Sequence, residues 1–439
     1  MSELRVWMNG AEVASWQEHT RTGPRLTYLP SWLASEQPRP LSLSLPLLPT
    51  GESHRGQVVT DYFDNLLPDN DNIRKRIRDR FGLQSADTFN LLQEIGRDCV
   101  GAVQLLAPGQ TPDDVHGIHA LPLSDGQVGD RLQMVTSAVL PGQPVDDEFR
   151  ISIAGAQEKT AFLWHDGQWC VPTGSTPSTH IFKLPLGLVG NMRADMHASV
   201  ENEWLCMQLL AAFGIPVANT SMGQFGEQRA LIVERFDRRL ARDGRWWLRL
   251  PQEDMCQAFG LPSTRKYESD GGPGIVQIME LLRQSMQPQD RATFFKTQIL
   301  FWLLAATDGH AKNFSIHIEA AGRFRLTPAY DVLSVYPILG GGPNQLAPQR
   351  AALAMSVAGK NRHRQLLRIR RRHWNQTARA CGIAEGAEPW IAELLERIEP
   401  AIDAVQALLP AGFPEHVATS IFDGLRQAGT RLTEMPEND

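Results

Sequence analysis

Several features that mark particular classes of protein are missing from this 439-residue sequence. The formal net charge is only −6, so the chain has no general attraction for nucleic acid, and any such attraction has to be local. Its five cysteines are scattered and never form a C-x₂-C pair, which argues against a disulfide framework and a structural zinc site. This cysteine usage favours a reducing compartment.

Long apolar segments are missing as well. The N-terminus lacks the apolar stretch of a signal peptide. The longest apolar run near the motif described below, residues 299–306, is far too short to cross a bilayer. We therefore expect a soluble, cytoplasmic protein with no membrane partner. The length, together with an apolar fraction of 42%, is typical of a globular protein with two or three domains.

The first part of the chain, residues 1–147, is expected to be a β-rich domain. Asn9-Gly10 is a strong hairpin turn between two alternating segments. The alternation of Leu41, Leu43 and Leu45 predicts another strand. Residues 107–147 are rich in Pro, Gly and Asp, which predicts a domain boundary at their end.

Two further parts follow this boundary. Residues 148–237 contain several strand-like segments, interrupted by a helix over about 198–213. Over residues 238–439 the apolar spacing is helical, and one long apolar helix is expected to stop at Asp308-Gly309. The pattern predicts an α+β fold in which a strand-rich part precedes a largely helical C-terminal part.

The end of that long helix carries the most informative motif, Thr307-Asp308-Gly309-His310-Ala311-Lys312-Asn313, followed later by Asp331. In phosphoryl transfer the protein positions the nucleophile and holds Mg²⁺ on the phosphates. Asp308 can accept the proton of an attacking hydroxyl, and Asn313 and Asp331 can bind Mg²⁺ through oxygen. The alternative is that Asp308-Gly309 merely ends a helix and Asp331 caps a turn. The order of helix, loop and second aspartate favours catalysis by a kinase.

A kinase also needs a lysine that reaches the phosphates. Lys183 lies in a strand-like segment whose apolar neighbours would bury an unpaired ammonium group at a considerable free-energy cost. Glu201 or Glu203 in the following helix can supply the carboxylate partner, and we favour Glu203. The alternative is a lysine on an edge strand that extends into water.

Two segments near this lysine can contact a nucleotide. The small residues of Ala154-Gly155-Ala156-Gln157-Glu158-Lys159 would let backbone N–H groups approach phosphates, although the segment is neither G-x-x-x-x-G-K-[ST] nor G-x-G-x-x-G. Glu234-Arg235-Phe236 ends the last strand before the helical part, where backbone groups of a kinase pair with adenine. An ordinary turn and a strand end with surface charges are the alternatives.

One cluster of positive charge stands out in this acidic chain. It consists of Lys360, Arg362, Arg364, Arg368, Arg370, Arg371 and Arg372. Contacts with nucleic acid would make binding salt-dependent, by roughly 0.9 log unit per log unit of salt for each phosphate neutralised. A solvated surface or an acidic protein partner explains the cluster equally well.

Longer segments resemble one known family, the HipA toxin kinases of bacterial type II toxin–antitoxin modules, over nearly the whole chain. The segments that carry the resemblance are Arg39 to Leu45, Phe63 to Pro68, Glu94 to Asp98, Ala154 to Thr160, Arg249 to Cys256 and Tyr267 to Gly274. The resemblance implies a serine/threonine protein kinase with a two-lobed fold related to eukaryotic protein kinases and to phosphoinositide (PI3/4) kinases. ATP would lie between the lobes.

The resemblance also implies roles for individual residues. Asp308 matches the catalytic base, Asn313 and Asp331 match the Mg²⁺ ligands, and Lys183 matches the phosphate-binding lysine. The positions that match other ATP contacts are Ala154, Gly155, Ala156, Gln157, Glu158, Lys159, Glu234, Arg235, Phe236, His310, Ala311, Lys312 and Tyr330. Ser152 matches the autophosphorylated serine, where a phosphate would repel those of ATP and inactivate the enzyme.

Partners are implied in the same way. The family's founding substrate is glutamyl-tRNA synthetase, whose phosphorylation stops tRNA charging and growth and gives multidrug tolerance. A HipB-like dimeric helix-turn-helix antitoxin would neutralise the kinase and hold it on operator DNA for autorepression. Arg379 matches a basic position that contacts DNA, whereas Gly382 departs from the family pattern three residues later.

Two other functions are alternatives to a toxin kinase. A small-molecule phosphotransferase can share the Asp-x₄-Asn loop and the later aspartate, but the family segments outside the ATP site argue against it. A non-catalytic corepressor is disfavoured because Lys183, Asp308, Asn313 and Asp331 are all present.

Overall fold

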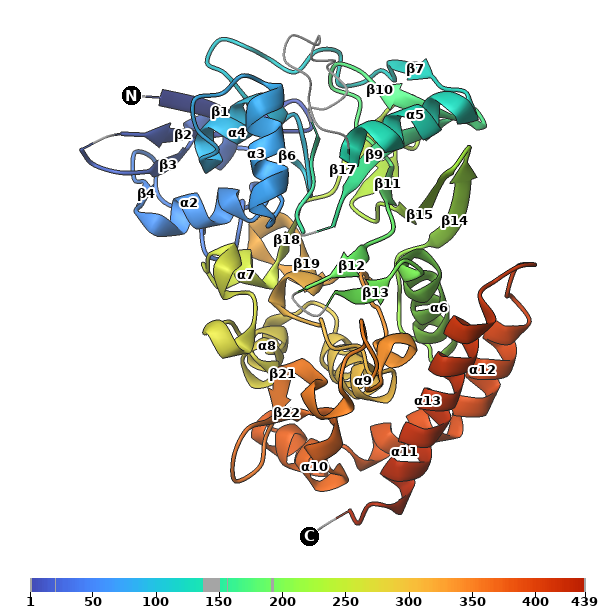
Figure 1. Ribbon diagram of the computed structural model, residues 1–439. Coiled ribbons are helices and arrows are strands. Elements are labelled where there is room, and N and C mark those ends of the chain that lie inside the picture. Colours follow the sequence, from blue (N-terminus) through green and yellow to red (C-terminus); the bar gives the residue numbers. More distant parts are fainter. Residues whose placement is uncertain (1, 20, 137–150, 156, 191–192, 438–439) are drawn as a thin grey trace. The chain divides into compact units, whose positions relative to one another are not determined.

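The computed structural model describes residues 2–19, 21–136, 151–155, 157–190 and 193–437 (Figure 1). The chain forms two compact units, and each unit combines segments that are distant in the sequence. The first unit consists of Met1–Leu184, Gly223–Arg265 and Ser315–Phe324, and the second of Pro185–Met222, Lys266–Phe314 and Arg325–Asp439.

The first unit opens with a five-stranded antiparallel sheet of order β4-β3-β2-β1-β6. The predicted Asn9-Gly10 turn joins β1 to β2, and both of its residues have positive φ, 48° and 84°. Alternate side chains of β1 are buried, as in a strand with one face on the core. The strands are β1 (Ser2–Met8), β2 (Ala11–Glu18), β3 (Arg25–Tyr28), β4 (His54–Arg55) and β6 (Val103–Leu106).

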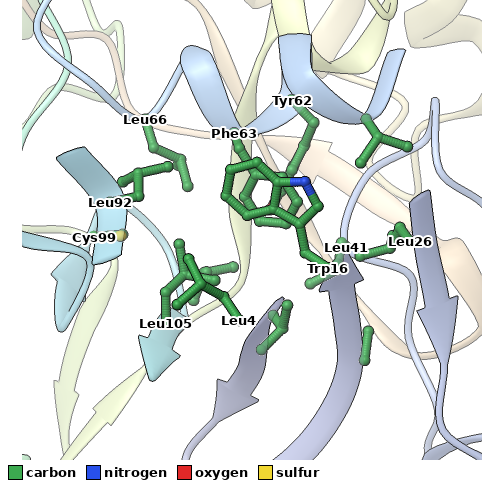
Figure 2. Close-up of a cluster of buried hydrophobic side chains, with 14 of the residues drawn as sticks. Leu4, Trp16, Leu26, Leu41, Tyr62, Phe63, Leu66, Leu92, Cys99 and Leu105 are labelled. Carbon is green, nitrogen blue, oxygen red and sulfur yellow. The ribbon is translucent and has the colours of Figure 1, made fainter. Parts of the chain in front are cut away.

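Helices supply the other half of this core (Figure 2). Trp16 of β2 stacks on Phe63 with ring centroids 4.0 Å apart, and Phe89 meets the same indole edge-on at 4.8 Å. Burying an aromatic side chain of this size stabilises a fold by about 1.5–3 kcal/mol. The helices of this region are α1 (Pro30–Leu33), α2 (Gln57–Asp64), α3 (Asp71–Arg80) and α4 (Thr88–Ile95).

The strand predicted from Leu41, Leu43 and Leu45 is wrong. This segment makes a single bridge between Ser42 and Leu45 and is otherwise a loop. Leu41 and Leu45 are buried, but the Tyr28 hydroxyl holds them by accepting from the Leu41 N–H at 2.8 Å and donating to the Leu45 carbonyl at 2.5 Å. Leu41 and Leu45 are therefore buried by a turn around one buried tyrosine, and their burial does not alternate as in a strand, because Ser42 is buried as well.

A second sheet in this part of the chain has the order β14-β15-β11-β9-β10-β7. Val128 and Leu132 of α5 (Asp125–Thr136) share its core with Phe162 and Phe182. The strands are β7 (Ala120–Pro122), β9 (Lys159–His165), β10 (Gln168–Pro172), β11 (His180–Lys183), β14 (Thr220–Phe225) and β15 (Gln228–Glu234). Strands β9, β10, β11 and β15 confirm strand-like segments predicted within residues 148–237.

Short elements complete the first unit. β5 pairs in parallel with β8, β16 pairs with β17, and β18 pairs with β19. The bounds of these elements are β5 (Asp98–Cys99), β8 (Ile151–Ser152), β16 (Arg238–Leu240), β17 (Trp247–Arg249), β18 (Gln252–Asp254), α7 (Met255–Ala258) and β19 (Ser315–Ile318). Strand β20 (Phe324–Leu326) begins at the last residue of this unit, and its other two residues belong to the second.

The proposed domain boundaries remain predictions. The one after residue 147 falls within residues 137–150, which lie outside the described residues, and the stretch before it contains β7 and α5. The boundary after residue 237 falls inside the segment Gly223–Arg265 of the first unit.

The second unit is mainly helical and is centred on α9 (Asp290–Leu303), whose residues are buried on nearly all sides. Helices α11, α12 and α13 pack beside one another (red in Figure 1). The other elements are β12 (Gly187–Val189), β13 (Ala194–Met196), α6 (Ser199–Ala212), α8 (Ile275–Leu281), β21 (Ala352–Val357), β22 (His363–Gln365), α10 (Arg371–Ala380), α11 (Glu388–Glu396), α12 (Ile398–Gln406) and α13 (Glu415–Glu434). None of the helices in the described part of the chain has the length and hydrophobicity that crossing a bilayer requires.

Candidate active site

Helix α9 leads into the Asp308 motif but ends at Leu303, earlier than the predicted stop at Asp308-Gly309. Ala305 adopts a left-handed backbone with φ 49°, and the Ala306 N–H donates to the Phe301 carbonyl at 2.7 Å. These are the features of a Schellman helix end, here with alanine where glycine is usual. The chain then turns into a loop that ends in a 3-10 turn at Ala311–Asn313.

The side chain of Asn313 joins the two aspartate segments. Its Nδ2 donates to the backbone carbonyl of Asp308 at 2.8 Å and, more weakly, to that of Asp331 at 3.5 Å. Since both bonds use the amide nitrogen, the amide oxygen Oδ1 is the atom left to bind a cation. The second unit therefore brings Asp308, Asn313 and Asp331 together, as the motif requires.

These residues fit Mg²⁺. The cation prefers oxygen ligands and is usually held by one or two carboxylates together with substrate phosphates. Asn313 and Asp331 offer an amide oxygen and a carboxylate. Within the described ranges no cluster of three or more His, Cys, Asp or Glu residues could hold a metal on its own. The donor set therefore suits a cation that arrives with a nucleotide.

Asp308 is exposed, so its carboxylate can meet a substrate hydroxyl. Its Oδ1 accepts a hydrogen bond from the Tyr267 hydroxyl at 2.6 Å. The next residue, Gly309, lies against Phe301, and a Cβ atom there would come within 2.2 Å of the ring. Only glycine lets the loop pack this closely on α9.

The other residues of this loop that were predicted to contact the nucleotide are buried. His310, Ala311 and Lys312 are each exposed by 6% or less. The Tyr330 hydroxyl donates to the Lys312 carbonyl at 2.8 Å, which ties the segment before Asp331 to the loop. Burial and this hydrogen bond fix the position of the loop.

The predicted phosphate loop lies in the first unit, between β8 and β9. The Lys159 ammonium donates to the Ala154 carbonyl, the Glu158 carboxylate pairs with Arg76 of α3, and Gln157 donates to the Leu184 carbonyl at 2.5 Å. The Gly155 carbonyl accepts from the Asp69 N–H at 3.0 Å. Ala156 lies outside the described residues. The side chains of this loop therefore take part in protein contacts in this conformation.

Lys183 ends β11 and is only 7% exposed. It lies opposite Lys159 of β9 and Leu231 of β15 in the sheet. Its proposed partners Glu201 and Glu203 lie on α6 of the second unit and are buried as well. Burial of Lys183 without a nearby anion would be unfavourable, which is consistent with the predicted ion pair or phosphate contact. The pairing itself remains a prediction.

The predicted adenine segment, residues 234–236, ends β15. The Arg235 side chain is buried in a network of charges, where it donates to Asp237 at 3.0 Å and to Ser178 at 2.9 Å and pairs with Asp98 at 3.3 Å. Its N–H donates to the Thr179 carbonyl at 2.9 Å. Glu234 pairs with His180 in the sheet, and the Phe236 ring meets His317 edge-on at 5.7 Å. The Arg235 side chain thus serves the fold, and its carbonyl accepts the Arg238 N–H at 3.1 Å.

Ser152 of β8 is fully buried. Its hydroxyl donates to the Leu66 carbonyl at 2.8 Å, and its strand pairs with Cys99 of β5. A phosphate group does not fit in this environment. Modification of Ser152 therefore requires β8 to leave its place.

The predicted DNA-contacting residue Arg379 is exposed on α10. Gly382, which departs from the family pattern, has φ 81°, and a Cβ there would come within 2.5 Å of the Arg283 guanidinium. A basic side chain at 382 would therefore need a different helix end. In the basic cluster Arg371 pairs with Glu388 and Arg362 with Glu268. Arg362, Arg368 and Arg370 are exposed.

Sequence reasoning missed two sets of residues. Asp98, Arg238 and Arg249 form the buried network around Arg235, and Tyr267 contacts Asp308. A signal was available, because Asp98, Arg249 and Tyr267 fall in segments that carry the family resemblance. Their roles depend on contacts between distant parts of the chain, which spacing does not reveal.

Asp308, Asn313 and Asp331, which all belong to the second unit, can support phosphoryl transfer. An exposed carboxylate can receive a proton, and oxygen ligands for a metal lie on segments that are bonded to the same loop.

Comparison with known proteins gives consistent results. The HipA N-terminal domain family matches residues 4–106, and the HipA-like C-terminal domain family matches residues 151–402. The protein named "Putative kinase Y4mE" of Sinorhizobium fredii is 34% identical over 361 residues, which are 80% of this chain and 82% of that protein. The serine/threonine-protein kinase toxin HipA of Shewanella oneidensis is 30% identical over 308 residues, 67% of each chain.

Among solved structures, HipA of Shewanella oneidensis in complex with HipB and its operator DNA has a TM-score of 0.77 and 23% sequence identity. The match covers 98% of this chain and 97% of that one. The predicted α+β, kinase-like fold is therefore confirmed. The domain matches and the identity to curated relatives establish the relationship at the level of sequence: the chain belongs to the HipA family of toxin kinases.

Proposed function

We propose that this chain is a toxin that acts as an ATP-dependent serine/threonine protein kinase. The observation that carries the proposal is the Asn313 amide, which bonds to the backbone of both Asp308 and Asp331. This contact supports a site in which a base and two oxygen ligands act on one phosphoryl group.

Each residue then has a task. Asp308 accepts the proton of the substrate hydroxyl, while Asn313 and Asp331 hold Mg²⁺, which supplies positive charge to the phosphates when bound. Lys183 contacts the phosphates. The other proposed nucleotide contacts are the segments 154–159 and 234–236 and the residues His310, Ala311, Lys312 and Tyr330.

For the substrate we propose a component of translation, with glutamyl-tRNA synthetase as the first candidate. Its modification would cause growth arrest and persistence. The basis is the family resemblance together with a curated relative that is named a serine/threonine-protein kinase toxin.

A HipB-like antitoxin is the proposed partner, with operator DNA bound through the complex. The solved structure of similar fold is a HipA complex with HipB and operator DNA. Exposed Arg379 and the exposed arginines of the basic cluster can add contacts to phosphates, although Gly382 contributes none. Such contacts predict that operator binding by the complex weakens with salt.

We also propose that autophosphorylation of Ser152 inactivates the kinase. Phosphate carries about −1.5 to −2 charges near pH 7 and does not fit the buried site of this hydroxyl. The modification would displace β8 and with it the start of the phosphate loop, so ATP binding should weaken.

The test compares wild type with Asp308→Asn in two assays: transfer of labelled γ-phosphate to purified glutamyl-tRNA synthetase, and growth arrest without antitoxin. Removal of a general base should lower the transfer rate by about 10²–10⁴-fold while ATP binding, measured by calorimetry, persists. Asp403→Asn, the same change at an exposed site on α12, is the control. If Asp308→Asn still transfers phosphate and arrests growth, the kinase mechanism is wrong. Transfer to small alcohols in place of proteins would instead indicate a small-molecule phosphotransferase.

A further inference from the structure

Tyr267, in a short segment just before α8, contacts the catalytic loop directly. Its hydroxyl donates to Oδ1 of Asp308 at 2.6 Å, and its ring meets the His310 ring edge-on with centroids 4.9 Å apart. The preceding carbonyl, that of Lys266, accepts the Ala311 N–H at 3.0 Å. All of these residues belong to the second unit, so the segment is fastened to the loop at three points.

The contact with Asp308 is the one that bears on chemistry. An O–H···O⁻ distance of 2.6 Å is in the range of charge-assisted hydrogen bonds, which are stronger than neutral ones. A carboxylate has two oxygens, and Tyr267 uses Oδ1. The other oxygen, Oδ2, can then accept the proton of a substrate hydroxyl. A base oriented by a third group is a recurrent arrangement in enzymes that activate a hydroxyl.

Tyr267 is itself held in place. Its carbonyl accepts the N–H groups of Asp270 at 3.0 Å and Gly272 at 2.9 Å. The next residue, Glu268, has a side chain that is only 8% exposed and accepts bonds from the Ser356 hydroxyl at 2.8 Å and from Arg362 at 2.7 Å. A tyrosine supported on both sides in this way can restrict the rotation of an exposed aspartate.

We propose that Tyr267 is a positioning residue for the phosphoryl-transfer step. Its hydroxyl fixes the Asp308 carboxylate so that Oδ2 faces the incoming substrate hydroxyl. Tyr267 keeps its own proton throughout, and the proton of the substrate goes to Asp308. The inference rests on the proposed kinase function, because it assigns Tyr267 a role only through Asp308.

An inhibitory role of the Tyr267–Asp308 contact predicts a different result from a positioning role. The Tyr267 hydroxyl could occupy the place of the substrate hydroxyl and thereby inhibit the kinase. Removing the hydroxyl would then speed transfer, whereas removal of a positioning bond slows it.

The decisive variant is Tyr267→Phe, which keeps the ring against His310 and removes only the hydroxyl. Loss of one charge-assisted hydrogen bond should lower kcat for phosphate transfer to protein by roughly 10- to 100-fold. The KM for ATP and the melting temperature should remain near those of wild type. A purely structural role would raise this KM and lower the melting temperature together.

Tyr336→Phe is the matched control. It removes a hydroxyl that donates to the Leu303 carbonyl at 2.9 Å and has no contact with Asp308. This variant should lose some stability but keep its kcat at temperatures where it is folded.

A double variant separates this inference from the proposed function. If Tyr267 acts through Asp308, Tyr267→Phe should cause no further loss in an Asp308→Asn background. An active Asp308→Asn variant would overturn the proposed function itself. If Asp308→Asn is inactive while Tyr267→Phe has an unchanged or raised kcat, only the positioning role is wrong.

Discussion

Asp98 is a residue whose replacement should strongly destabilise the first unit. It lies in a buried network with Asp237, Arg235, Arg238 and Arg249, all of them 6% exposed or less. Its carboxylate pairs with Arg238 at 2.9 Å and with Arg235 and Arg249 at 3.3 Å each. Two carboxylates thus face three guanidinium groups. Asp98→Asn would leave those three cations with one anion in a buried site.

The magnitude follows from burial. Removing one partner of a buried ion pair typically destabilises a protein by about 3–5 kcal/mol, because the remaining charge is left without compensation. For a unit of this size, that loss corresponds to a fall in melting temperature of about 6–20 °C. Since whole proteins are stable by only about 5–15 kcal/mol, the variant should be close to unfolding under mild denaturant.

The dependence on pH gives an independent check. Burial alone would raise the pKa of Asp98, but Arg238, Arg235 and Arg249 hold it well below its usual range. A carboxyl whose folded pKa is lowered stabilises the fold above its unfolded pKa, about 3.9, and loses this effect as the pH falls towards the folded value. The difference between wild type and Asp98→Asn should therefore be constant from pH 5 to 8 and become smaller below pH 4.

Differential scanning calorimetry of both proteins over this pH range is the appropriate assay. Asp243→Asn is the control, because Asp243 also pairs with an arginine, Arg245 at 3.0 Å, but is exposed to solvent. That variant should melt like wild type. The reasoning is refuted if Asp98→Asn melts no lower than the control, or if its deficit is as large at pH 3 as at pH 7.

Two further predictions concern Gly309 and Glu253. Gly309→Ala would place a Cβ within 2.2 Å of the Phe301 ring. This overpacking should destabilise the protein by about 1–3 kcal/mol and reduce phosphate transfer. Full activity and an unchanged melting temperature would contradict the packing argument. Burial raises the pKa of Glu253 to about 8, although the Leu43 N–H bonds to its carboxylate at 2.8 Å. Stability from a group with a raised folded pKa is full below its unfolded pKa and is lost as the pH rises through the folded value. The melting temperature of Glu253→Gln should therefore rise relative to that of wild type as the pH is raised from 5 to 8. A difference that does not change with pH would show that Glu253 does not titrate in this range.

Local patterns were reliable where neighbours in the sequence decide the structure. Asn9-Gly10 predicted a hairpin because few residues accept two successive positive φ angles, and the turn is present. The strands around Phe162 and Phe182 and the helix α6 were predicted from periodicity alone.

Two predictions failed where distant residues decide the structure. Leu41, Leu43 and Leu45 alternate like a strand, but the Tyr28 hydroxyl and the Glu253 carboxylate hold this segment as a loop. Helix α9 ends earlier than predicted because Ala305 adopts a left-handed backbone, and the Val335 N–H donates to its carbonyl at 3.0 Å. No local signal indicates either contact.

By itself, the sequence determined the α+β class, the order of strand-rich and helical parts, and the residue types needed for phosphoryl transfer. These follow from periodicity and from the chemistry of Asp308, Asn313 and Asp331. Only the tertiary structure decided that the Asn313 amide bonds to both aspartate segments, that Tyr267 holds Asp308, and that Arg235 is committed to a buried network with Asp98. The physical reason is that hydrogen bonds and ion pairs depend on distances in space, and folding sets these distances between residues that can be far apart in the chain.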